Sequence, residues 1–149
     1  MDQIRPWLFI GSYRDTNNLS YLTYKSIGAM LQLAEKVEQP GITSLYLPVE
    51  DLAPISSQHI RQGLDFIMDH KARGNRVLIA CGAGINRSSA FSAAALKEDE
   101  KLGLLEAFKQ VKHCHAESMP HQPVWESLCL YYGEDVPYLD IMRLGFVKG

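Results

Sequence analysis

The chain has 149 residues, enough for one domain with a sizeable core, and its 46% hydrophobic and 21% charged residues are ordinary for a globular protein. Its net charge of −2 provides no basic field for nucleic acid or a membrane surface, and no apolar run approaches the roughly 18 residues that span a bilayer. The first residues lack a signal-peptide pattern, and the three cysteines lack zinc-motif spacing. We therefore expect a single domain over residues 1–149, located in the cytoplasm, where a thiol stays reduced.

The first half of the chain alternates between short apolar runs and segments of helical character. The longest helix is expected where Ile60, Leu64 and Ile67 recur at helical spacing before Gly74. A turn is expected at Pro40-Gly41. The sequence predicts strands at 7–10, 29–34 and 43–49 and helices at 20–25 and 57–73.

The second half opens on a run, 77–80, that is apolar at every position, as expected of a central strand covered on both faces. Helices are then expected at three places: from Ser88 onward, through the stripe of Leu104, Phe108 and Val111, and over 123–132. Strands mixed with helices, followed by helices alone, predict an α/β domain around a central sheet.

The most informative segment joins that central strand to the next helix. A strand that enters a small-residue loop and leaves at a helix N-terminus forms an anion site, because backbone N–H groups point inward and the helix dipole adds positive charge. A potential nucleophile starts the loop and a fixed cation ends it, so the pattern indicates a phosphate that is attacked. The segment is Cys81-Gly82-Ala83-Gly84-Ile85-Asn86-Arg87-Ser88. We expect residues 82–87 to bind the phosphate.

Each end of this loop has a predicted role. Cys81 is the predicted nucleophile, since loop amides and Arg87 favour the thiolate over the thiol. Arg87 offers a planar fork that holds two phosphate oxygens at once. For Ser88 two roles stay open: a hydroxyl that donates to the Cys81 sulfur and stabilises it as a leaving group, or a helix cap.

A phosphatase also needs a proton donor for the departing oxygen. Asp51 follows the strand predicted at 43–49, at the carboxyl end where the sites of α/β proteins gather. Glu50 is its close competitor. The residues alone leave the choice between the two acids open, although the alternation of an extended chain is expected to turn Glu50 to the other face.

With these residues the chain resembles the cysteine-dependent phosphatases, specifically the small dual-specificity type. The family pattern His-Cys-x-x-Gly-x-x-Arg-Ser/Thr is matched at Cys81, Gly84, Arg87 and Ser88. Asp51 stands at the family's typical separation of thirty residues before the cysteine, so the resemblance implies that Asp51 is the general acid. The resemblance covers most of the chain. It implies a mixed, mostly parallel sheet flanked by helices, a phosphocysteine intermediate, and a shallow pocket open to phosphotyrosine, phosphoserine and phosphothreonine in proteins or peptides.

One departure from the family pattern keeps alternatives open. Ala80 stands where the family usually has a histidine that orders the loop and tunes the thiolate. A second hypothesis is therefore a phosphate-binding module with little turnover. A third is the same chemistry on a lipid, a nucleotide or an RNA end, although the loop lacks the lysines of phosphoinositide phosphatases.

No metal or other cofactor is expected. The run His113-Cys114-His115 contains three potential ligands, but adjacent residues on a helix point away from one another and cannot converge on one ion. Cys129 lies in an apolar helix and is predicted to be core.

Overall fold

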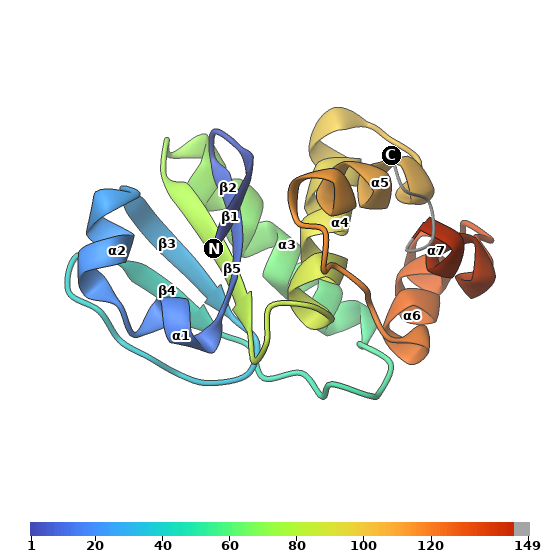
Figure 1. The fold of residues 1–149 in the computed structure, drawn as a ribbon, viewed down its shortest axis with the longest axis horizontal. Helices are drawn as coiled ribbons and strands as arrows, with labels where there is room; N and C mark the ends of the chain where they lie inside the picture. The colour runs from blue at the N-terminus through green and yellow to red at the C-terminus, as the bar shows by residue number, and fades with distance from the viewer. Residues whose placement is uncertain (145–149) are drawn as a thin grey trace.

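The computed structural model describes residues 1–144 of the chain, which form five strands and seven helices (Figure 1). The strands are β1 (Asp2–Arg5), β2 (Leu8–Ser12), β3 (Ile27–Gln32), β4 (Thr43–Tyr46) and β5 (Arg76–Cys81). The helices are α1 (Tyr13–Thr16), α2 (Leu19–Tyr24), α3 (Ser57–Ala72), α4 (Arg87–Glu100), α5 (Leu104–Cys114), α6 (Gln122–Tyr132) and α7 (Tyr138–Leu144).

The strands form one mixed, mostly parallel sheet in the order β1-β2-β5-β3-β4. Only β1 runs antiparallel to its neighbour, so four parallel strands end at the same edge. Ser12 pairs with Cys81 on one side of β5, and Gln32 pairs with Ala80 on the other. This register confirms the expected sheet and places Cys81 at its carboxyl edge, between two neighbouring strands.

The two faces of β5 are covered by different helices, because successive side chains of a strand point to opposite sides. Val77 and Ile79 enter the large core beneath α3–α6, whereas Leu78 and Ala80 enter a smaller core that includes Leu22 of α2. Figure 1 shows α1 and α2 on one side of the sheet and the later helices on the other. The uniformly apolar run was therefore correctly interpreted as a central strand.

Most predicted elements agree with the structure to within a few residues, but three short ones were missed. These are β1, α1 and α7, of four, four and seven residues. In β1 only Ile4 is buried, and in α7 only Ile141, so neither segment shows a hydrophobic period. The helix ending at Tyr132 is consequently not the last, and Cys129 is only half-buried.

The strand predicted over 43–49 ends earlier, at Tyr46. The chain beyond it stays extended: the Leu47 amide donates to Gln32 at 2.9 Å and the Val49 amide to Leu33 at 3.2 Å. Leu47 and Val49 are buried while Glu50 is exposed. The alternation therefore continues past the strand, and it carries the acidic pair to the carboxyl edge of the sheet.

No helix within residues 1–144 combines the length and the apolar character needed to cross a bilayer.

Candidate active site

The loop of residues 82–86 leaves β5 at Cys81 and enters α4 at Arg87. Cys81 is buried at its base, and its Sγ lies 3.1 Å from Oγ of Ser88, within hydrogen-bond distance. Ser88 is fully buried, and the structure shows no side-chain cap on α4. Of the two roles left open for Ser88, the geometry favours the partner of the sulfur over the helix cap.

The carbonyl groups of the loop accept hydrogen bonds from outside it. Gly82 accepts from the Tyr13 amide at 3.3 Å, Ile85 from the Met119 amide at 3.0 Å, and Gly84 lies 2.7 Å from Nε2 of His115. In a planar trans peptide the C=O and N–H point in opposite directions. The amides that follow these carbonyls are thereby turned away from the donors, as an anion cradle requires.

Gly84 has a conformational reason to be glycine. Its φ is +74°, in the left-handed region, and a Cβ built there would lie 2.8 Å from the carbonyl oxygen of Gly11. Any larger residue would both strain the backbone and push the loop away from the end of β2.

The Arg87 guanidinium folds back beneath the loop. Its Nη1 donates to the carbonyl of Val49 at 2.9 Å and, more weakly, to that of Leu33 at 3.4 Å. A Cβ added at Gly82 would lie 3.4 Å from Nη2. Nε is buried without a hydrogen-bond partner within the described part of the chain. Arg87 therefore ties two strand ends to the loop and keeps donor capacity on its loop side.

Asp51 lies beside the loop, as the sequence predicted. Nδ2 of Asn86 donates to its carbonyl at 2.5 Å and to its Oδ1 at 2.6 Å, and Nε of Arg87 is 3.5 Å from Oδ1. His121 approaches from the start of α6, with its Nδ1 3.1 Å from the Asp51 carbonyl. The carboxylate thus faces donors while its side chain stays half-exposed.

An open depression of 660 Å³ lies in front of Arg87. Glu50 lines this depression, whereas Asp51 lies beside the loop and is not part of the lining. The expectation that Glu50 turns to the other face is therefore wrong, because the chain turns at Asp51 and the alternation ends there. The depression is lined by Tyr13, Leu33, Ala34, Glu35, Pro48, Val49, Glu50, Gly82 and Arg87.

Two histidines that touch the site were not foreseen. His115 contacts the loop and His121 contacts Asp51, yet they lie 34 and 40 residues beyond Cys81. Neither carries a local signal, since no motif links them to Cys81. In the sequence His115 stands out only as a potential metal ligand beside His113 and Cys114, and that role is not expected.

A buried cysteine at the base of a short loop, with an arginine at the start of the following helix, is the arrangement of the cysteine-dependent phosphatase class. The family model described as "Dual specificity phosphatase, catalytic domain" matches residues 8–134. The chain therefore belongs to the dual specificity phosphatase family.

Relatives and solved structures agree with this family. Human dual specificity protein phosphatase 5 is 31% identical over 140 residues, which cover 91% of this chain and 36% of that protein. Dual specificity protein phosphatase 18 of Bos taurus is 26% identical over 135 residues, covering 88% of this chain and 72% of that protein. The crystal structure of human DUSP28 shares the fold, with a TM-score of 0.83 and 24% identity over 89% of this chain and 96% of that one. The chain spans about a third of the length of dual specificity protein phosphatase 5.

Proposed function

We propose that this domain hydrolyses phosphate monoesters on proteins or peptides through a phosphocysteine. Cys81 Sγ attacks phosphorus in line, the bond to the substrate oxygen breaks, and water then cleaves the sulfur–phosphorus bond to release inorganic phosphate. The observation that carries this proposal is the buried sulfur at the base of the loop, 3.1 Å from the Ser88 hydroxyl. That hydroxyl donates to the thiolate and stabilises the sulfur when it leaves.

The phosphoryl oxygens are held by groups whose charge is already in place. The backbone amides of residues 82–86 and the guanidinium of Arg87 face the position of the dianion. Because Arg87 is anchored on the Val49 carbonyl, its fork needs no reorganisation when phosphate arrives.

Asp51 is proposed as the proton donor to the departing oxygen and as the base that activates water in the second step. Asn86 holds this carboxylate next to the loop at 2.6 Å. Glu50 lines the depression, so Glu50→Gln is the variant that separates the two acids.

The depression is open, and we propose that it accepts phosphotyrosine together with phosphoserine and phosphothreonine. The three cysteines are free, which suits a nucleophilic thiol in a reducing compartment such as the cytoplasm. We propose that residues 1–149 act as one catalytic domain.

The test is turnover of matched phosphotyrosine, phosphoserine and phosphothreonine peptides with chelator present. Wild-type protein should release phosphate, and Cys81→Ser should abolish release while retaining phosphate or vanadate binding. Turnover that survives Cys81→Ser, or that chelator removes, would contradict the mechanism.

A phosphate-binding module with weak turnover is the second candidate, and Ala80 favours it. Its methyl group is buried in the small core and offers no polar atom to the loop. This hypothesis is supported if the wild-type protein binds phosphate but releases none from any of the three peptides.

A further inference from the structure

The backbone of the phosphate-binding loop is contacted by a side chain that comes from outside both the loop and its flanking elements. His115 follows α5, is buried, and places Nε2 2.7 Å from the carbonyl oxygen of Gly84. Gly82 and Ile85 are held instead by the backbone amides of Tyr13 and Met119. Those two anchors do not depend on side-chain identity, whereas the anchor on Gly84 depends on His115.

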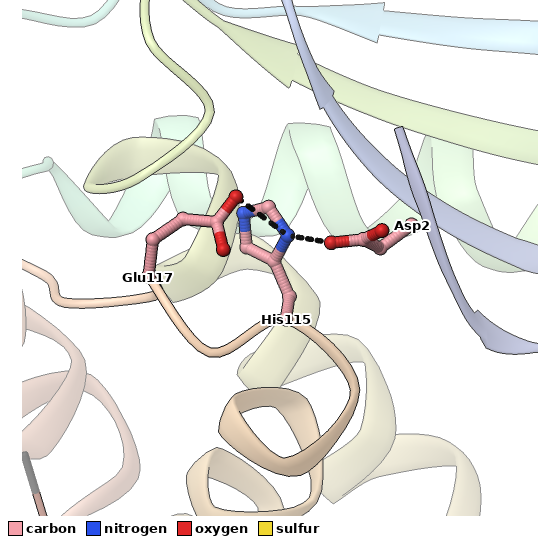
Figure 2. Close-up of side chains that lie close together, drawn as sticks. All are labelled: Asp2, His115 and Glu117. Atoms are coloured by element: carbon pink, nitrogen blue, oxygen red, sulfur yellow. Dashed lines mark hydrogen bonds and ion pairs between the residues drawn. The ribbon is translucent and has the colours of Figure 1, made fainter.

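The other edge of the His115 ring is fixed by carboxylates. Nδ1 lies 2.5 Å from Oδ2 of Asp2 on β1 and 3.4 Å from Oε1 of Glu117 (Figure 2). A carbonyl and a carboxylate accept hydrogen bonds, so each ring nitrogen of His115 faces an acceptor. Asp2 and Glu117 hold the Nδ1 edge, and Gly84 lies at the Nε2 edge.

The same three side chains resemble a metal ligand set, since their ligand atoms lie within 4.8 Å of one another. However, 2.5 Å between Nδ1 and Oδ2 is a hydrogen-bond distance, and no ion fits between two atoms so close. A ligating nitrogen in His115 would also have to give up this bond. The geometry is that of a hydrogen-bonded chain from Asp2 through His115 to Gly84.

From this chain we infer that His115 is a positioning residue for the phosphate-binding loop. Holding the Gly84 carbonyl fixes the Gly84–Ile85 peptide plane, and the Ile85 N–H then points to the opposite side, into the cradle. The hydrogen bond to the Gly84 carbonyl also polarises that peptide and strengthens the Ile85 N–H as a donor to phosphate. The inference rests on the proposed function, because it assigns the Ile85 amide to phosphate.

Two substitutions of His115 distinguish the contact made by Nε2 from the contact made by Nδ1. Glutamine carries its amide as many bonds from Cα as Nε2, so His115→Gln keeps a donor to Gly84. Asparagine carries its amide where Nδ1 stands, so His115→Asn keeps the Asp2 end and loses Gly84. His70→Gln is the matched control, because His70 is equally buried and bonds Asn75 at 2.9 Å near the start of β5, at the opposite end from Cys81.

The readouts are kcat/KM on a phosphotyrosine peptide and protection of Cys81 from iodoacetamide by inorganic phosphate, followed by mass spectrometry of the Cys81 peptide. His115→Asn should weaken both by roughly tenfold to a hundredfold, the range expected when a buried carbonyl loses its donor. His115→Gln should stay within roughly threefold of wild type. His70→Gln should leave both unchanged while lowering thermal stability.

Equal losses in His115→Gln and His115→Asn, or no loss in either, would overturn the inference. If His115→Asn does not fold, Asp2→Asn carries the test, because its side chain is half-exposed. In Asp2→Asn the protection of Cys81 by inorganic phosphate should weaken by roughly threefold. Protection equal to that of the wild type in this variant would also overturn the inference. Failure of the proposed function gives a different result from failure of this inference. In that case the wild-type protein shows no turnover, or turnover survives Cys81→Ser.

Discussion

Asn86 and Asp51, thirty-five residues apart, are joined by two hydrogen bonds from one amide group. Nδ2 of Asn86 donates to the Asp51 carbonyl at 2.5 Å and to its Oδ1 at 2.6 Å. The other end of the amide, Oδ1, accepts from the His121 backbone N–H at 2.6 Å. One loop side chain therefore links the segment that bears the proposed acid to the segment that leads into α6.

This link predicts that Asn86→Asp impairs proton donation more than phosphate binding. An aspartate keeps an acceptor for the His121 amide but presents oxygen to the Asp51 carboxylate, and the two like charges repel. Turnover of a phosphotyrosine peptide should fall by roughly tenfold or more, as after loss of one charge-assisted hydrogen bond. Turnover of an activated aryl phosphate should fall much less, since its leaving group departs without a proton.

A double-mutant cycle supplies the control for this prediction. In an Asp51→Asn background the Asn86→Asp change should have little further effect, because the two residues act through one contact. Additive losses would show that Asn86 acts elsewhere.

Asp51→Asn should slow phosphopeptide turnover by roughly the 10²–10⁴ of general acid catalysis and slow difluoromethylumbelliferyl phosphate much less. The pH–rate profile should also lose its alkaline limb, because the group that must stay protonated is gone. Glu50→Gln is the matched control, with near wild-type kinetics expected. If Glu50→Gln shows the large loss and Asp51→Asn does not, the donor is Glu50, which lines the depression.

Arg87→Lys should lower kcat/KM by at least about a hundredfold, on the scale of roughly 2.7–4 kcal/mol for a lost transition-state donor. Lysine keeps the charge but loses the planar fork. It also loses the bond to the Val49 carbonyl at 2.9 Å, which anchors the guanidinium. Steady-state kinetics with unchanged circular dichroism would measure the effect. Near-normal kinetics would show that Arg87 does not clamp the phosphate.

A fourth prediction concerns Glu134, which connects the helices behind the site. Its Oε1 accepts from the Leu104 amide at 2.9 Å, at the N-terminus of α5, and its carboxylate pairs with Lys97 of α4. Burial raises the pKa of Glu134, but the hydrogen bonds from Lys97 and Leu104 outweigh it and hold that pKa below its usual range. A carboxyl with a lowered pKa stabilises the fold above its unfolded pKa, and this contribution is lost as the pH falls through the folded value.

Glu134→Ala should therefore lower the free energy of unfolding at neutral pH by about 1 kcal/mol, the typical value of a lost helix cap. Urea unfolding at several pH values would show the difference shrinking below about pH 4. Glu126→Ala, on the exposed face of α6, is the control, and its effect should stay within about 0.5 kcal/mol. If Glu134→Ala lowers the free energy of unfolding by the same amount at every pH, the loss comes from packing alone.

The sequence alone determined the loop and the order of the elements around it. Cys81, Arg87 and Ser88 are contiguous with a strand and a helix, so local hydrophobic periods and small residues are enough to predict their arrangement. The contact of 3.1 Å between Cys81 and Ser88 follows from that short separation. The spacing of Asp51 from Cys81 likewise indicated an acid at the carboxyl edge of the sheet, where the structure places it.

Only the tertiary structure decided which distant groups hold the loop. His115 reaches Gly84, Asn86 reaches Asp51, and Arg87 reaches the carbonyl of Val49. Each contact joins segments about thirty or more residues apart, and each depends on how α5 and the strand ends pack together. The carbonyl of Val49 has no identity that a sequence could reveal, and a histidine after a helix looks the same whether it faces solvent or a loop. The loop residues Cys81, Arg87 and Ser88 are therefore locally encoded, whereas the groups that contact the loop from distant segments are set by packing.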